Sequence, residues 1–169
     1  MGAVMSDSSF KSDPEALETL RSYMPGRYIS SLHCNDIFHM GYCDLYLEAQ
    51  DVRFPEEDHL NNILRENFPY MMEGIDPEFV AENALISNRM RSVVKDVKIS
   101  EDGSLTLYFN DCPEMILTTD TEIVDWQWSL SKTGETPYWG YMVACFDRGI
   151  VQVSPESEDF VGVESRKPV

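Results

Sequence analysis

The sequence of 169 residues predicts a single α+β domain over residues 1–169, built on a mostly antiparallel sheet of about five to seven strands. Apolar and polar residues alternate between Ser92 and Leu130, which is the pattern of strands with one buried face. Three earlier segments carry apolar residues at helical spacing instead. They predict an N-terminal helix and a central helix pair packed on one face of the sheet. A chain of this length buries a core without disulfides or metals.

The N-terminal helix is expected to follow residues 1–11, which are small and polar and are predicted to be mobile. Ser12, Pro14 and Glu15 form a helix start, because Ser12 supplies a capping oxygen and Glu15 completes a capping box around the proline. The apolar stripe of this helix consists of Leu17, Leu20 and Met24, and Pro25-Gly26 ends it.

The segment from Arg27 to Glu48 predicts one long bent strand or a hairpin, with a break or bulge at Gly41. A helix is then expected to begin at the acidic residues 56–58 and to stop or kink at Pro69. A second helix start follows at Asp76-Pro77. The buried side of this second helix is predicted to consist of Phe79, Val80, Ala84 and Ile86.

The stretch 92–130 is expected to contain three or four strands of one sheet, and Gly103 supplies the positive φ of its first hairpin. Its last predicted strand runs from Val124 to Leu130, with Trp126 and Trp128 on the apolar side. A final hairpin is predicted around residues 147–149, and residues 156–169 are expected to form a mobile tail.

Charge is the second feature of this sequence. The net charge is −17, and it is divided as −10 over residues 1–90 and −7 over the remainder. Between Ile99 and Ser131 there are seven acidic residues and no lysine or arginine, which predicts a sheet with an anionic outer face and anionic turns. Such a field disfavours binding to nucleic acid and anionic membranes, and it favours cationic partners.

The chain shows no secretory signal and no membrane-spanning segment, so we expect a soluble, cytoplasmic protein. The four cysteines form no CxxC pair and are interpreted as small buried hydrophobic residues. No GxSxG, HExxH, GxGxxG or GxxxxGK motif is present. The sequence therefore predicts a protein that is not an enzyme and that uses no cofactor.

One set of residues has the types that bind zinc, in the spacing HC-x4-H-x3-C. Its members are His33, Cys34, His39 and Cys43. Zinc requires ligands that converge at about 2.0 to 2.3 Å. On a strand, His39 and Cys43 would lie roughly 13 Å apart, so they share one ion only if the chain folds back at Gly41. A small zinc-dependent enzyme or metal-binding protein is therefore kept as an alternative.

A candidate partner-binding surface combines acidic residues with an aromatic loop that follows them. Tyrosine and tryptophan are enriched at binding hot spots because they bury a large area at a small entropic cost. The alternative is that Trp139 folds back over the core. The predicted binding residues are Asp111, Glu114, Asp120, Glu122, Asp125, Tyr138, Trp139 and Tyr141.

Residues 87–130 carry a Ser-Asn-Arg opening, the glycine hairpin, Leu-Thr-Leu-Tyr-Phe at 105–109 and Glu-Ile-Val-Asp-Trp-Gln-Trp at 122–128. This pattern resembles the small acidic immunity proteins of bacterial polymorphic toxin systems. The resemblance implies an acidic cytosolic domain that binds a cognate toxin, blocks its active site and has no activity of its own. The resemblance transfers no functional residue to this chain.

The leading hypothesis is therefore an immunity protein whose cationic partner is a secreted toxin domain. A second hypothesis is a nucleic-acid mimic that inhibits a DNA- or RNA-binding enzyme. Phosphates along one DNA strand are nearly 7 Å apart, and alternate residues of a β-strand are about 6.6 Å apart. Asp120, Glu122 and Asp125 would begin such a row if they lay on a strand.

Overall fold

The computed structural model describes residues 13–69, 77–122, 124–132, 138 and 140–154, and it confirms the predicted α+β class. This part of the chain contains three helices and ten strands. The elements are α1 (Pro14–Tyr23), β1 (Ser31–Cys34), β2 (Phe38–Tyr42), β3 (Leu45–Ala49), β4 (Val52–Arg53), α2 (Glu57–Asn67), α3 (Pro77–Asn88), β5 (Val94–Ile99), β6 (Leu105–Phe109), β7 (Met115–Leu117), β8 (Trp128–Ser131), β9 (Tyr141–Asp147) and β10 (Ile150–Val153). Within it, no helix is long and apolar enough to cross a membrane.

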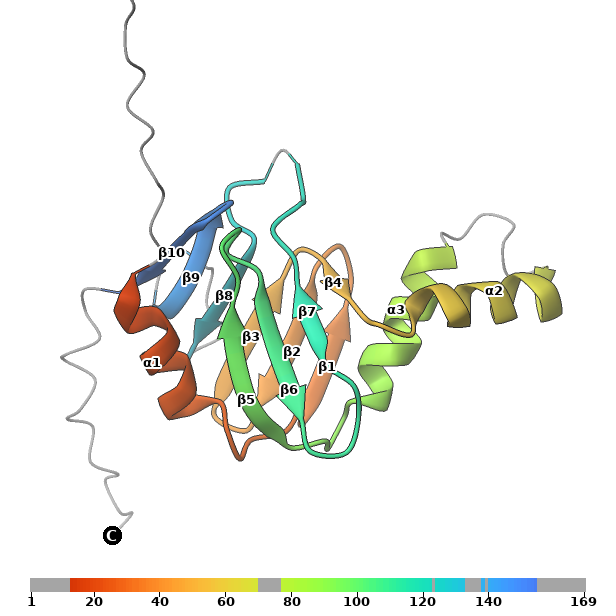
Figure 1. Cartoon of the computed structure of the whole chain (residues 1–169), viewed down its shortest axis with the longest axis horizontal. Helices are drawn as coiled ribbons and strands as arrows, with labels where there is room; N and C mark the ends of the chain where they lie inside the picture. The colour runs from red at the N-terminus through yellow and green to blue at the C-terminus, as the bar shows by residue number, and fades with distance from the viewer. Residues whose placement is uncertain (1–12, 70–76, 123, 133–137, 139, 155–169) are drawn as a thin grey trace, which may run out of the picture.

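The strands form two antiparallel sheets that lie one in front of the other (Figure 1). The larger sheet has the order β1-β2-β3-β8-β9-β10, and the smaller has the order β4-β7-β6-β5. One row of paired apolar residues crosses all six strands of the larger sheet, namely Leu32, Met40, Leu47, Leu130, Val143 and Val153. Residues of the smaller sheet that complete the same core include Val52, Val97, Leu105, Leu107 and Leu117.

The stretch 92–130 does not form one sheet, which corrects the sequence prediction. Strands β5, β6 and β7 belong to the smaller sheet, whereas β8 pairs with β3 and β9 in the larger one. The chain passes from one sheet to the other over residues 118–127. Alternation of apolar residues identifies a buried face but does not specify which sheet covers it, so the sequence pattern could not reveal this division.

Trp128 connects the two sheets. Its side chain is fully buried, and its indole N–H donates a hydrogen bond of 2.9 Å to the carbonyl of Gly103 in the turn between β5 and β6. Gly103 has the predicted positive φ, at 85°, and a Cβ there would lie 3.1 Å from the sulfur of Cys145. Trp126 is also buried, as expected. The turn therefore packs directly on the larger sheet and needs glycine.

Helix α1 lies beside β5, β9 and β10 and covers one open side of the sandwich (Figure 1). Its N-cap is Asp13, whose side chain accepts a hydrogen bond from the backbone N–H of Glu15; the predicted cap, Ser12, lies outside the described residues. Ala16 and Leu20 are buried beneath the helix. Arg21 pairs with Asp96 on β5 at 3.0 Å, which links the helix to the smaller sheet.

The break predicted at Gly41 lies two residues later in the chain. Strand β2 continues through Gly41, and the turn to β3 is formed by Cys43, with φ of 61°, and Asp44. The absence of a Cβ at position 41 leaves room for the hydroxyl of Ser31 on the neighbouring strand β1.

Helices α2 and α3 pack on each other and stand beside the sandwich, next to β4 (Figure 1). Arg89, which follows α3, is fully buried and donates hydrogen bonds of 2.7 and 2.8 Å to the carboxylate of Glu56. Its guanidinium also lies 4.7 Å from the ring centre of Phe54. Arg53 on β4 pairs with Glu57 of α2 and Glu82 of α3. These ion pairs connect the start of α2 and the end of α3 with β4, and we call this region the base of the helix pair.

The predicted buried side of α3 is only partly correct. Ile86 is buried, but Phe79 is 36% exposed and Ala84 is exposed. The residues that are covered instead include Ala81 and Leu85, which are four apart and lie on one face. Because the helix stands beside the sheets, it has fewer neighbours than a helix packed across a sheet, and part of its apolar surface stays in contact with water.

We predict that Trp128→Phe lowers the free energy of unfolding by at least about 1 to 3 kcal/mol, because the buried carbonyl of Gly103 loses its hydrogen-bond donor. Urea denaturation monitored by circular dichroism measures this change. Tyr108→Phe is the matched control, since Tyr108 is 37% exposed, and we expect a change within about 0.5 kcal/mol. Equal effects of the two substitutions would show that the indole hydrogen bond does not connect the sheets.

A second prediction concerns the base of the helix pair. Glu56→Gln leaves the buried guanidinium of Arg89 without a carboxylate, and removing one partner of a buried ion pair typically costs about 3 to 5 kcal/mol. Asp96→Asn at the exposed Arg21–Asp96 pair is the control, with an expected loss below about 1 kcal/mol. Chemical denaturation measures the loss in the free energy of unfolding for both variants. If Glu56→Gln lost less than Asp96→Asn, this prediction would be contradicted.

Candidate functional site

Three of the predicted binding acids, Asp120, Glu122 and Asp125, lie on the connection between β7 and β8 and are exposed. The strand predicted from Val124 begins only at Trp128. Before it, the side-chain amide of Gln127 donates a hydrogen bond of 2.9 Å to the carbonyl of Thr121, six residues earlier in the connection. The acids therefore do not form a row on a strand, and the spacing argument for nucleic-acid mimicry loses its structural basis.

The aromatic residues of the predicted site meet one of these acids. The hydroxyl of Tyr138 donates a hydrogen bond of 3.1 Å to the carboxylate of Asp125. The ring of Tyr138 stacks on Phe146 with 6.0 Å between ring centres, and Tyr141 meets the same phenylalanine edge-on at 5.1 Å. We call the set Asp120, Glu122, Asp125, Tyr138, Tyr141 and Phe146 the acidic–aromatic rim. Trp139, which was also predicted, lies outside the described residues.

Phe146 was missed by the sequence analysis, and a bulge in β9 explains why. Tyr141 and Phe146 are five residues apart, so a regular strand would direct their side chains to opposite faces. The pairing of β8 with β9 moves from Val143 opposite Leu130 to Tyr141 opposite Ser131, and this shift leaves Met142 as an extra residue. The bulge reverses the alternation, and the two rings meet.

The electrostatics of the rim favour a protonated phenol. Desolvation raises the pKa of Tyr138 above its usual value, and the hydrogen bond to the Asp125 carboxylate raises it further. Asp120 lies near the turn between β9 and β10, where Arg148 approaches it to 3.5 Å. Both of these side chains are 66% exposed, so this pair contributes little to stability.

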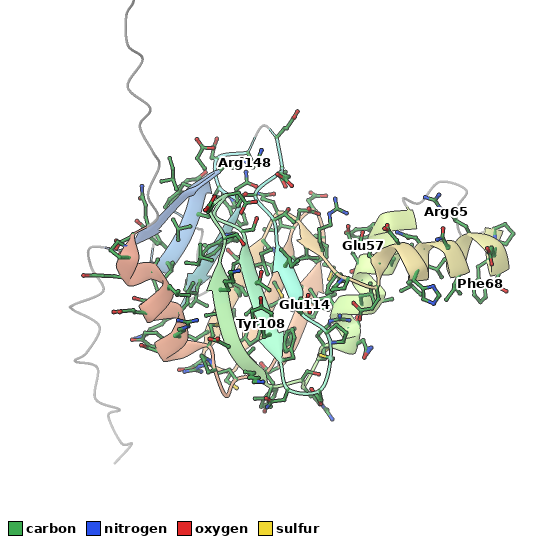
Figure 2. The ribbon with its side chains drawn as sticks, in the orientation of Figure 1. Glu57, Arg65, Phe68, Tyr108, Glu114 and Arg148 are labelled. Carbon is green, nitrogen blue, oxygen red and sulfur yellow. The ribbon has the colours of Figure 1, made fainter. Side chains whose placement is uncertain are left out.

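The remaining two predicted acids, Asp111 and Glu114, lie elsewhere. They belong to the connection between β6 and β7, at the opposite end of β7 from Asp120 (Figure 1). Glu114 lies beside Tyr108 on the outer side of the smaller sheet (Figure 2). Its backbone carbonyl is 3.5 Å from the guanidinium of Arg89. The predicted set thus divides into two separate groups, and only one of them contains the aromatic residues.

The four candidate zinc ligands do not converge. Cys34 pairs with the first residue of β2 and Cys43 follows its last residue, so the two thiols lie at opposite ends of this strand. His33 lies opposite His39, but the Nδ1 atom of His39 is bound to Glu48 at 2.8 Å. No group of three or more histidine, cysteine or acidic side chains in the described ranges is placed to hold a metal ion.

Two of the cysteines are poor nucleophiles. Burial raises the pKa of the Cys34 thiol. Burial and the nearby Asp147 raise the pKa of Cys145 to about 12. A thiol with a raised pKa remains protonated at neutral pH and reacts slowly.

Comparison of the chain with protein-family models, curated proteins and solved structures finds no match.

We predict that the phenol of Tyr138 remains protonated to a higher pH than an ordinary tyrosine, because its raised pKa favours the neutral form. Asp125→Asn removes the carboxylate charge and lowers this pKa toward the usual value. An NMR titration of the labelled tyrosine ring carbons measures the pKa of Tyr138 in the wild type and in the Asp125→Asn variant. Asp111→Asn is the control and should leave the titration of Tyr138 unchanged, since Asp111 lies in the other group of acids. Identical titrations of the wild type and Asp125→Asn would contradict the contact.

Proposed function

We propose that this protein binds and inhibits a basic partner protein, and that it docks through the acidic–aromatic rim. The observation that carries the proposal is the direct contact between aromatic rings and an exposed acid, in which Tyr138 both stacks on Phe146 and bonds to Asp125. Aromatic anchors such as tyrosine are typical of protein-binding hot spots. The rim supplies apolar area for affinity and carboxylates for orientation.

The charge of the chain supports a cationic partner. A net charge of −17 attracts basic proteins at long range and repels acidic proteins and nucleic acid. At the rim, Asp120, Glu122 and Asp125 are exposed, so they remain available for charge pairs with a partner. Complementary charge of this kind mainly accelerates association, and the acceleration falls with ionic strength.

The immunity role is the more specific part of the proposal and rests on the resemblance of residues 87–130 to immunity proteins of polymorphic toxin systems. Under this proposal the partner is a secreted toxin domain, and the rim covers its basic active-site cleft. A nuclease toxin fits best, because a cleft that binds nucleic acid presents lysine and arginine side chains. Inhibition then requires only that the rim occupies this cleft.

The decisive experiment begins with capture of basic proteins from the source cell at low salt, followed by association kinetics with the captured partner. The triple variant Asp120→Asn, Glu122→Gln, Asp125→Asn should fold normally, because exposed polar exchanges cost within about 0.5 kcal/mol each. We expect its association rate to fall about tenfold at low salt and to depend less on salt concentration.

The matched control is the double variant Asp111→Asn, Glu114→Gln, which removes two charges from the other group of acids. It should retain most of the association rate of the wild type. If the double variant slows association and the triple variant does not, the partner binds at the connection between β6 and β7 and the rim is the wrong surface. Absence of any basic protein partner would refute the proposed function as a whole.

A further inference from the structure

Strand β1 forms one edge of the larger sheet, and its outer side is open. The edge strands of the two sheets are β1, β10, β4 and β5. At β10, the carbonyl of Val151 accepts a hydrogen bond of 3.0 Å from the N-cap of α1. At β5, Val94 forms hydrogen bonds of 2.8 and 2.9 Å with residues 26–27, and the helix pair stands next to β4 (Figure 1). Beside β1, the hydrogen bond from Arg91 to the carbonyl of Ile29 ends the contact before the strand begins.

The backbone groups on this open side belong to Leu32 and Cys34. The N–H of Asn35 donates to the carbonyl of Ile37 at 3.1 Å in the turn between β1 and β2. Hydrogen-bonded and non-hydrogen-bonded pairs alternate along an antiparallel ladder, so the backbone groups of Leu32 and Cys34 face away from β2. Neither residue forms a hydrogen bond to another segment within the described part of the chain. The edge therefore presents N–H and C=O groups that a further strand can bind.

The side chains of β1 leave the core incomplete at the same edge. Leu32 and Cys34 pack on the core but stay only half-buried, whereas their neighbours across the ladder, Met40 and Phe38, are buried. His33 lies on the opposite face and is exposed. An added strand with apolar residues beside Leu32 and Cys34 would extend both apolar rows.

Charge indicates what kind of strand fits this edge. The sequence from Tyr28 to Asn35 has no Asp, Glu, Lys or Arg, although the chain has 30 acidic and 13 basic residues. A basic partner finds no carboxylate on this strand with which to pair, and a second copy finds no like charge there. Repulsion between two copies of net charge −17 acts at long range and is screened by salt. The strand therefore favours a second copy as its occupant.

We propose that two copies of this chain pair along their β1 strands, antiparallel to each other, about a two-fold axis at His33. In this register Leu32 lies opposite Cys34 of the second copy, and His33 lies opposite His33 of the second copy. Because opposite residues of a sheet point to the same face, the apolar side chains of both strands stay on the core side. The pairing is isologous and joins two six-stranded sheets into one. This interface goes beyond the proposed function and uses no residue of the rim.

The register follows from the outward backbone groups of both strands. Leu32 of each copy exchanges two hydrogen bonds with Cys34 of the other, as in the hydrogen-bonded pairs of any antiparallel ladder. An axis at Leu32 would instead place Cys34 opposite Ser30, whose N–H is already bound within its own hairpin. An axis at Cys34 would place the charged Asp36 opposite the apolar Leu32. The axis at His33 is therefore the one that completes the edge.

Sedimentation equilibrium of the full chain tests the association. We expect a reversible dimer whose population rises with protein concentration. The Debye length falls from about 10 Å at 0.1 M salt to about 3 Å at 1 M, so added salt should strengthen this association. Binding of a basic partner at the rim is expected to weaken with salt. The two interactions are therefore distinguished by the sign of their salt dependence.

A charge at the axis supplies the first variant. His33→Glu puts two like charges directly opposite each other, with about 4.5 Å between Cα atoms, and should raise the dissociation constant of the dimer about fivefold. His59→Glu is the matched control, because His59 is exposed on α2 and the change in net charge is the same. This control should leave the dissociation constant unchanged.

Oxidative cross-linking tests the register. His33→Cys places two thiols in a non-hydrogen-bonded pair at the axis, where the short distance between Cα atoms permits a disulfide. Ser31→Cys, on the same face of the same strand, places its two thiols about 13 Å apart along the strands and should form no such bond. Peptide mass spectrometry identifies the cross-link and separates it from any bond of the native cysteines.

The proposal is overturned if the chain stays monomeric at millimolar concentration and high salt, if His33→Glu and His59→Glu change dissociation equally, or if Ser31→Cys cross-links as readily as His33→Cys. A strand of another protein as the occupant would give the first of these results. Capture of a basic partner by a chain that stays monomeric would remove only the β1 interface. Dimer formation without any basic protein partner would support the interface and remove only the proposed function.

Discussion

The close approach of the turn between β5 and β6 to the larger sheet is the constraint on which the rest of the structure depends. Gly103 accepts the indole hydrogen bond of Trp128, and its missing Cβ leaves room for the sulfur of Cys145. The adjacent carbonyl of Asp102 accepts hydrogen bonds from Thr119 at 2.8 Å and from the backbone of Gly149 at 2.7 Å. These contacts fix the chain where it crosses between the sheets, and thereby fix the position of the proposed binding acids.

Charge is distributed unequally between the two ends of the fold. At the base of the helix pair, the buried Arg89 pairs with Glu56, and the partly exposed Arg53 pairs with Glu57 and Glu82. Near the crossing connection, the exposed Asp120 meets Arg148 at 3.5 Å, and both side chains are 66% exposed. Exposed acids that lie close together repel one another and do not favour folding. The binding role that we propose would give these acids, which lie beside aromatic rings, a purpose other than stability.

The sequence predicted local structure better than assembly. Helix starts at Pro14 and Pro77 and the turn at Gly103 were correct, because each depends on a few adjacent residues. The division into two sheets was not predictable, because it depends on pairings such as Trp128 with Cys145 and Ala49 that lie far apart in sequence. The rim was found only in part, because the bulge that joins Phe146 to Tyr141 depends on the pairing of β8 with β9.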